Sequence, residues 1–284
     1  MAVLYKSLNV DEKYASAIEP NLYADPIFIP GVTFTDKYEE GPAGQIMVHK
    51  LQKGNAVVPG TPGRDFTDED VADDLIAIQL NNNFQKSTKI YGVQENAVAF
   101  NVGEEKLQQS LEMVREGRQY SGLACLVNEG TVMEDTTATT SETAVANLIA
   151  MRKAVKDNHG TVDVALVNTS VYAFLLENLG LKENSDPAIV SAELIKRFGM
   201  NIIECNSFDE AEAKYYNYAG TLQTVDLTKV EMVVYWHEAF SIIDNFEMYR
   251  LKDSENFAGV KAQVEENVGY RVSTAEQVLV KKSA

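Results

Sequence analysis

The sequence has few of the residues from which catalytic and metal sites are most often built. Its 284 residues include two cysteines, three histidines and one tryptophan. Cys125 and Cys205 stand in the apolar stretches LACLV and NIIECN, and no CxxC pair is present, which excludes the common redox motif and a cysteine zinc site. We therefore expect two buried, inert thiols and no need for an oxidising compartment.

Catalytic motifs are missing as well. The sequence has no GxGxxG, no GxxxxGK[ST], no HExxH and no GxSxG. His49, His159 and His237 are widely separated, and nothing in their spacing predicts that two of them converge on a metal ion or a triad. For His237, which stands beside Glu238, we expect a structural role. The sequence thus predicts no enzyme, no cofactor and no metal site.

Long apolar runs and an excess of basic residues are also absent. No stretch approaches the length that spans a bilayer, and the N-terminal MAVLYKSLNVDEKY lacks the apolar segment of a secretory signal, so we expect no membrane association. The 25 basic and 42 acidic residues give a formal net charge of -17. A surface of this sign repels phosphate, which argues against nucleic acid wrapped around the whole surface. It is compatible with an acidic container in which DNA stays mobile.

The first hundred residues are predicted to be an extended arm and a long hairpin without a core of their own. Four prolines disfavour helix in residues 1–42, the expected arm, since each pushes the preceding residue out of helical space. Residues 43–88 contain two alternating runs, one around Ile46 and Val48 and one around Ile76 and Ile78, which predict two strands of a hairpin. Such a pair is marginal alone in water, so we expect another chain to cover it.

The connection between these two strands carries a dense run of charge, GTPGRDFTDEDVADD. It lacks the glycine and glutamate positions of an EF-hand, so a solvated loop is a better interpretation than a cation site. A third interpretation is that the run pairs with charges on a neighbouring subunit and fixes its register. The candidate inter-subunit contacts in this loop are Lys50, Lys53, Arg64, Asp65, Asp68, Glu69, Asp70, Asp73 and Asp74, with Lys86 and Lys89 flanking the hairpin.

The rest of the chain divides by periodicity into three parts. Residues 89–135 begin with a short strand, IYGV, and continue into a helix that opens near Gly103 and extends toward Cys125, although Gly117 and Gly122 each disfavour a continuous helix. Residues 136–239 alternate helices with compact strands, as an α/β unit does. Residues 240–284 complete a series of antiparallel strands, EMVVYWHEAFSII, NFEMYRL, VKAQVEENVGYRV and EQVLVKK, of which the last two are expected to be half-exposed.

Taken in order, these elements resemble the Hong Kong 97-like major capsid proteins of tailed bacteriophages. The stretch VDVALVNTSVYAFLLEN is similar to the strand and helix of that family's A-domain, and AELIKRFGMNIIECNSF to the helix and strand that follow. VVYWHEAFSIIDNFEMYRL and GVKAQVEENVGYRVSTAEQVLVKK are similar to the last return through its P-domain. The resemblance covers nearly the whole chain and rests on the order of elements, since the family has no short diagnostic motif.

The resemblance implies an α+β fold with an N-arm (1–42), an E-loop hairpin (43–88), a first P-domain part with the spine helix (89–135), an A-domain (136–239) and P-domain return strands (240–284). It implies a structural protein that forms the pentamers and hexamers of an icosahedral shell around double-stranded DNA, in a virion assembled in the host bacterial cytoplasm. Its partners would be copies of itself, a portal, decoration proteins and a separate scaffold, unless the chain has been trimmed or needs no scaffold. The alternatives are an encapsulin-like compartment shell, a phage tail-tube or adaptor protein, and an unrecognised α/β enzyme.

Overall fold

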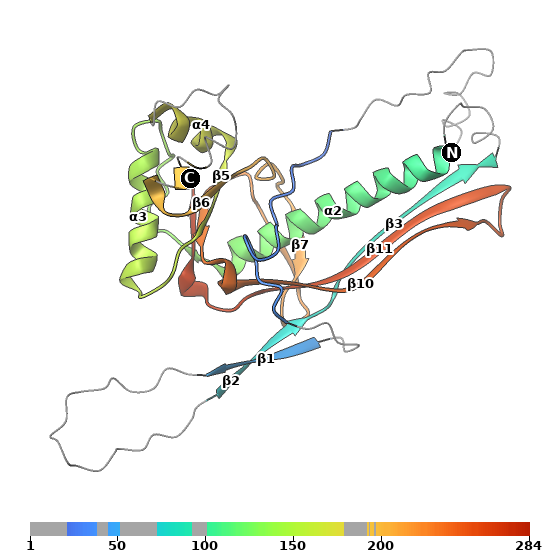
Figure 1. Cartoon of the computed structure of the whole chain (residues 1–284), viewed down its shortest axis with the longest axis horizontal. Helices are drawn as coiled ribbons and strands as arrows, with labels where there is room; N and C mark the ends of the chain where they lie inside the picture. Colours follow the sequence, from blue (N-terminus) through green and yellow to red (C-terminus); the bar gives the residue numbers. More distant parts are fainter. Residues whose placement is uncertain are drawn as a thin grey trace, which may run out of the picture.

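The computed structural model describes residues 22–38, 45–51, 73–92, 101–178, 192, 194, 195 and 197–284. Figure 1 shows two bodies side by side, a long one made of one helix on a narrow sheet and a compact one made of shorter helices and strands. A separate pair of strands, β1 and β2, projects below the place where the two bodies join.

The long body is a helix laid along a three-stranded antiparallel sheet. The sheet has the order β10 (Phe240–Asp253), β11 (Gly259–Val272) and β3 (Asn82–Tyr91), and α2 (Val102–Glu129) packs against all three strands. The helix opens where it was predicted, because the Asn101 side chain accepts a hydrogen bond from the Glu104 backbone N–H at 3.2 Å. It continues without a break to Glu129, so Gly117 and Gly122 do not interrupt it.

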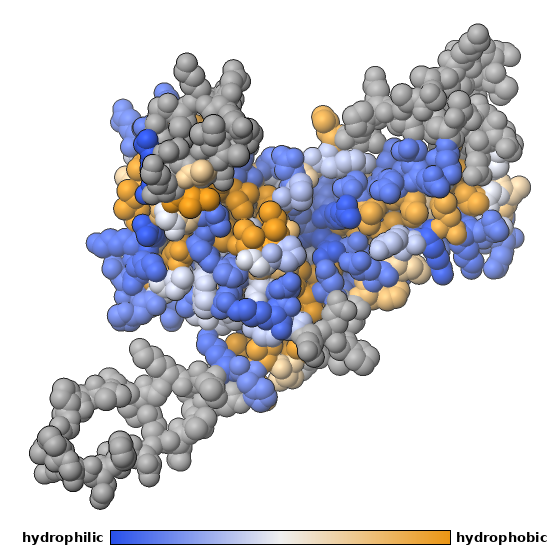
Figure 2. Space-filling view, in the orientation of Figure 1, coloured by the Kyte–Doolittle hydropathy of each residue, from blue (hydrophilic) through white to orange (hydrophobic). Residues whose placement is uncertain are grey.

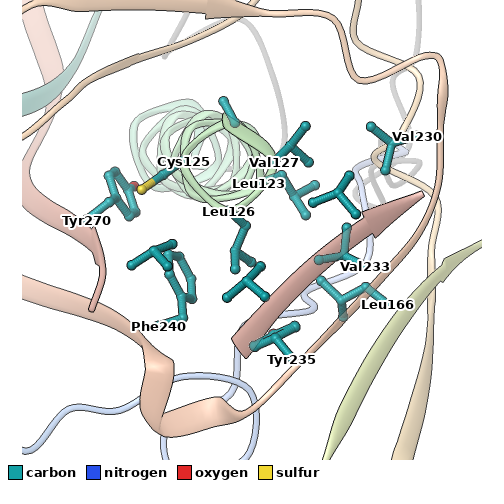
Figure 3. Close-up of a cluster of buried hydrophobic side chains, with 14 of the residues drawn as sticks. Leu123, Cys125, Leu126, Val127, Leu166, Val230, Val233, Tyr235, Phe240 and Tyr270 are labelled. Carbon is teal, nitrogen blue, oxygen red and sulfur yellow. The ribbon is translucent and has the colours of Figure 1, made fainter. Parts of the chain in front are cut away.

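The compact body is built on a five-stranded sheet. The order is β4 (Thr131–Val132), β12 (Val278–Lys282), β9 (Val230–Tyr235), β5 (Val164–Asn168) and β6 (Asn201–Cys205). Side chains of α3 (Ala144–Asp157) and α4 (Thr169–Asn178) cover one face of this sheet. The last turns of α2 cover the other face, where Leu126 and its neighbours meet Val233 and Tyr235 (Figure 3). The two bodies therefore share one hydrophobic core.

Two short strand pairs complete the fold. The β1 (Gln45–Leu51) and β2 (Asp73–Gln79) strands pair antiparallel, with Ile46 opposite Ile78 and Val48 opposite Ile76. This confirms the predicted pairing of the two alternating runs. The second pair, β7 (Ala213–Tyr216) and β8 (Leu222–Val225), contacts α2. Residues 82–88, which the sequence analysis placed in the hairpin, instead begin β3 and pair with β11.

The predicted strand EMVVYWHEAFSII is wrong as a single strand. The chain leaves β9 at Tyr235, makes one turn of 3-10 helix at His237–Ala239 and then enters β10. This turn carries the chain from the compact sheet to the long sheet. The predicted strand NFEMYRL is part of β10 itself, which continues past a bulge between Asp244 and Phe246.

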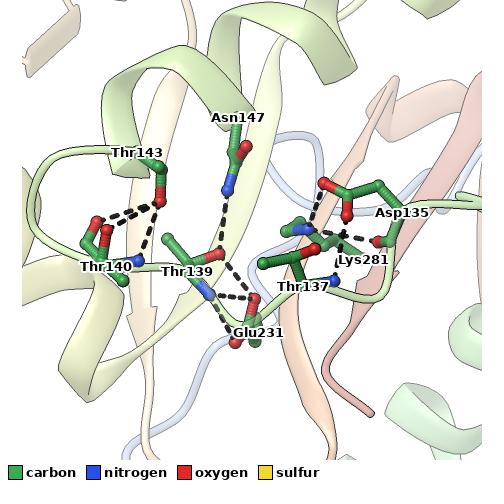
Figure 4. A network of polar contacts seen from close by, with 8 residues as sticks. All are labelled: Asp135, Thr137, Thr139, Thr140, Thr143, Asn147, Glu231 and Lys281. Carbon is green, nitrogen blue, oxygen red and sulfur yellow. Dashed lines mark hydrogen bonds and ion pairs between the residues drawn. The ribbon is translucent and has the colours of Figure 1, made fainter.

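The prediction of a half-exposed last strand is also wrong. β12 lies between β9 and β4 in the compact sheet, and its first four residues are buried because both faces of that sheet are covered. Even Lys281 is 0% exposed, and its ammonium donates to the Asp135 carboxylate and to the Asp135 carbonyl, each at 3.2 Å (Figure 4). The C-terminal strand therefore completes the α/β body, although the sequence grouped it with the return strands 240–284. By contrast, β11 alternates between buried and half-buried residues as predicted.

Candidate assembly surfaces

In the described part of the chain, no three His, Cys, Asp or Glu residues come together as metal ligands would. No helix in the described ranges is long and apolar enough to cross a membrane. The ring of His237 contacts Asp163, and its backbone N–H donates to the same carboxylate at 2.8 Å.

Both cysteines are buried thiols. Burial raises the pKa of Cys205 to about 12 and raises the pKa of Cys125 well above its ordinary value. Neither is a thiolate at neutral pH, so the structure confirms the expectation of inert thiols.

The described part of the N-terminal arm, residues 22–38, packs against its own subunit. Ile27 is 1% exposed, and its backbone N–H donates to the Gln119 side chain of α2 at 3.0 Å. The Gln119 amide donates in turn to the Asp25 carbonyl at 2.8 Å. Phe28 lies over Gly122, where an added Cβ would come within 2.7 Å of its ring. The prediction that the arm has no core of its own is therefore wrong for these residues, because α2 presents a glycine and an amide that receive the arm.

A partly buried arginine fixes the helix to the sheet beneath the arm. Arg118 of α2 donates to Glu266 of β11 at 2.6 Å and to Asp244 of β10. The Tyr270 hydroxyl donates to the Arg118 carbonyl at 3.0 Å. A pocket of about 330 Å³ remains between these residues and the prolines of the arm. The network ties α2, β10 and β11 into one rigid support.

The β1–β2 pair is fixed along the C-terminal part of β11, at both of its ends. Lys50 donates to the Ser273 carbonyl at 3.2 Å and to the Thr274 hydroxyl at 3.0 Å. Gly269 allows the chain to cross here, since a Cβ on it would come within 2.7 Å of Leu80 and 2.9 Å of the Gln79 carbonyl. The hairpin therefore leaves the molecule at a defined place.

The predicted contact residues of the hairpin are only partly described. Lys50 contacts its own subunit, as given above. Asp73 and Asp74 lie in β2, where Asp74 is opposite Lys50 and Asp73 opposite Leu51. The remaining candidates lie outside the described residues: Lys53, Arg64, Asp65, Asp68, Glu69 and Asp70. Of the two flanking lysines, Lys86 stands opposite the buried Val264, on the sheet face that α2 covers, and Lys89 lies on the other face.

Apolar side chains are exposed on strands that lie at the edge of a sheet. Leu75 on β2 is 55% exposed and Tyr249 on β10 is 57% exposed. β10 is an edge strand of the long sheet, so its outer backbone groups have no partner strand among the described residues. Figure 2 shows apolar surface along the long body and on the β1–β2 pair, between hydrophilic margins. Surfaces of this kind are typical of faces that another chain covers.

A row of lysines crosses the end of the long sheet, and sequence reasoning missed two of its members. Lys252 of β10 pairs in register with Lys261 of β11, which pairs in register with Lys89 of β3. Residues directly opposite in an antiparallel sheet share a face, so the three ammonium groups project from the same side. The alternation within β11 indicated which side Lys261 faces, but only the pairing between strands, with Lys89 and Lys261 172 positions apart, could reveal the row.

No sequence-family model matches the chain, and no curated protein sequence matches it. Solved structures do match. The capsid structure of cyanophage P-SCSP1u has a TM-score of 0.71 at 13% identity, over 96% of this chain and 92% of that one. The mature capsid of bacteriophage PhiM1 has a TM-score of 0.65 at 14% identity, over 96% and 91%.

The chain has a phage capsid fold. The matches cover 96% of this chain, so the predicted α+β, Hong Kong 97-like architecture is confirmed. The capsid fold is also found outside the phages in this comparison: a virus-like particle from Pyrococcus furiosus matches with a TM-score of 0.55 at 13% identity, over 84% of this chain and 86% of that one.

Proposed function

We propose that this protein is a major capsid protein, a structural, non-enzymatic subunit that assembles with copies of itself into an icosahedral shell around double-stranded DNA. The observation that carries the proposal is the match of 96% of the chain to phage capsid structures. The net charge of -17 fits a container that encloses DNA without binding its sequence. The subunits would form pentamers and hexamers, assemble in the host bacterial cytoplasm and remain in the virion capsid.

The parts of the subunit would have different roles in assembly. The compact A-domain, residues 136–239 together with β12, would gather around the local symmetry axes. The long P-domain, built from 89–135 and the return strands, would form the framework between them. The arm (1–42) and the E-loop hairpin (43–88) would each extend over neighbouring subunits, and the rigid support around Arg118 suits such a framework. A separate scaffold, a portal and decoration proteins complete the proposed set of partners.

An encapsulin-like compartment shell is the second candidate. The match to the virus-like particle from Pyrococcus furiosus favours it, although that match is lower in TM-score and in coverage than those to the two phage capsids. The two functions differ in cargo. Nuclease-protected DNA inside purified particles supports the capsid, and a stoichiometric protein cargo without DNA supports the compartment.

Negative-stain electron microscopy of the purified chain tests the proposal. We expect closed shells or rings of five and six subunits, with and without co-expressed scaffold. Particles that stay compact and monomeric at high concentration in both conditions would overturn it, whereas open tubes would favour the tail-tube alternative.

A further inference from the structure

The lysine row at the end of the long sheet is a local cluster of positive charge in a protein whose net charge is -17. Lys252, Lys261 and Lys89 stand side by side on adjacent strands, which lie about 4.8 Å apart. Like charges directly opposite one another destabilise a sheet. The subunit therefore carries a self-repelling cationic row at a place where the fold does not require it.

The charges around the row do not neutralise it. Lys252 lies 3.8 Å from Glu255, but both side chains are more than half exposed, at 53% and 86%. Lys89 lies over the ring of Phe257, 5.9 Å from its centroid, which is a favourable site for a cation and holds the charge in place. Glu265, farther along the same face of β11, accepts hydrogen bonds from Asn83 and Gln85. Asp253 also borders the row, and a hollow of about 130 Å³ lies beside Lys261 and Lys252.

The described geometry separates this row from the acidic run of its own chain. The hairpin that carries the run is fixed at Ser273 and Thr274, beyond the C-terminal end of β11. Lys261 lies near the other end of that strand, about 40 Å away at 3.3 Å per residue. Figure 1 shows β1 and β2 leading away from that end of the sheet. Each half of the connection 52–72 has about ten residues and can extend at most about 35 Å, so the row is reached more readily from another subunit.

We propose that Lys89, Lys252 and Lys261 form the docking site for the acidic E-loop run, Asp65–Asp74, of a neighbouring copy of this chain. The run from Arg64 to Asp74 contains six acidic residues and one arginine, a net charge of -5, which complements the row. Docking removes the repulsion within the row and fixes the position of one subunit on the next. This inference rests on the proposed shell function, since it names the contact through which subunits recognise each other.

Reversal of the central charge tests the docking site. In the isolated subunit Lys261→Glu places a carboxylate between two lysines, so we expect a subunit at least as stable to heat as the wild type. Its assembly should nevertheless fall about tenfold or more in yield of closed shells, because the docking site now repels the acidic run. Lys153→Glu, at an exposed lysine of α3, makes the same change in net charge and should assemble normally.

A charge exchange identifies the partner. Asp68, Glu69 and Asp70 changed together to lysine should block assembly, as should Lys89, Lys252 and Lys261 changed together to glutamate, and both sets in one chain should restore shells. Independently, wild-type-like subunits carrying only Lys261→Cys, mixed with subunits carrying only Glu69→Cys, should form a disulfide between different chains on assembly. Cys125 and Cys205 are buried, so they should not compete for disulfide formation.

Three results would overturn the inference. Lys261→Glu could assemble like the wild type, the mixed cysteine subunits could assemble without cross-linking, or Lys261→Glu shells could form normally and lose only their DNA, which would assign the row to nucleic acid. In each case the wild-type shells still form, so the proposed function stands. Absence of wild-type shells under all conditions would instead overturn the proposed function itself.

Discussion

At the scale of single residues, Gly117 and Gly122, two of the three glycines of α2, differ in what surrounds them. An added Cβ at Gly122 would lie 2.7 Å from the ring of Phe28 in the arm, whereas one at Gly117 would lie 3.5 Å from the ring of Phe84. The first distance is a clash and the second is an ordinary contact. Gly122 is thus required by the arm, and Gly117 is not required by any packing around it.

Alanine substitution should separate these two roles. Gly117→Ala should stabilise the subunit by up to about 1 kcal/mol, the gain in helix propensity. Gly122→Ala should instead destabilise it by about 1–3 kcal/mol, since the arm must move. Urea unfolding of unassembled subunits measures both values. In a Phe28→Ala background the clash is gone and Gly122→Ala should become stabilising; continued destabilisation there would contradict this role of the arm.

The Lys281–Asp135 contact is the second feature at this scale. Hydrogen bonds from Thr137, followed by the interaction with Lys281, lower the pKa of Asp135 to about 2 (Figure 4). Lys281 itself is fully buried, and its ammonium donates to this carboxylate and to the Asp135 carbonyl. The pair fixes β12 to the segment that follows β4.

This contact predicts a specific dependence of stability on pH. The pKa of Asp135 is lower in the folded subunit than its ordinary value of 3.8, so its contribution is complete above about pH 4 and is lost as the pH falls toward 2. We expect Asp135→Asn to be less stable than the wild type at pH 7 and to lose less on acidification between pH 4 and 2. Thermal unfolding at several pH values measures this, with Asp157→Asn at the exposed end of α3 as the control. Parallel curves for wild type and Asp135→Asn would contradict it.

At the scale of elements, the fold is held by contacts between segments that are far apart in sequence. Gln119 of α2 holds the arm by hydrogen bonds. Its side chain accepts from the Ile27 N–H and donates to the Asp25 carbonyl and to the Ser207 hydroxyl. The linker before α3 is fixed to β9 by the buried Glu231, which accepts from the Thr139 backbone and hydroxyl (Figure 4). In each case a buried polar side chain holds in place a segment that is neither helix nor strand.

Removal of the Gln119 side chain should release the arm and leave the rest folded. Gln119→Ala leaves the buried Ile27 N–H without its acceptor, so we expect a loss of about 1–3 kcal/mol in the local stability of residues 22–38. Hydrogen exchange followed by mass spectrometry should show faster exchange in the arm and unchanged protection in β9. Arg115→Ala, which removes an exposed pair with Glu112 on the same helix, should change exchange little. Unaltered arm exchange in Gln119→Ala would show that the apolar contacts of Ile27 suffice.

At the scale of the whole molecule, the subunit has a large core that joins its two bodies, and several uncovered margins. That core joins α2, one face of the compact sheet and the arm, and a second core lies on the other face of the same sheet. The margins are the β1–β2 pair, the edge strand β10 and the lysine row. In the proposed shell, neighbouring copies would cover these margins.

Assembly should therefore raise thermal stability. Contacts that exist only between folded subunits stabilise the native state by mass action. We expect wild-type shells to unfold at a higher temperature than the unassembled Asp68, Glu69, Asp70→Lys subunit, measured by differential scanning calorimetry. The Lys153→Glu protein, which should assemble, serves as the control. Equal unfolding temperatures for shells and subunits would mean that the margins contribute no stabilising contact.

Local periodicity and punctuation determined much of the fold. The helix from Gly103, the strand Asn201–Cys205, the pairing of the hairpin strands and the order of the long body and α/β unit all follow from local signals, because a cap or an alternating run depends on neighbouring residues only. The absence of catalytic motifs and the order of elements were enough to predict a capsid fold. That prediction needed no distance between distant residues.

Tertiary structure alone decided where these elements went. EQVLVKK has the composition of an exposed final strand, but in the structure it pairs between β4 and β9 and is buried there. Lys281 of this strand then pairs with Asp135. The arm has extended, proline-rich character in sequence, and only the glycine and amide presented by α2 give it a place on its own subunit. The lysine row exists only through the register of three strands. Burial, register and charge neighbourhood depend on residues a hundred or more positions apart, which is why local sequence determined the elements and long-range packing decided their surfaces.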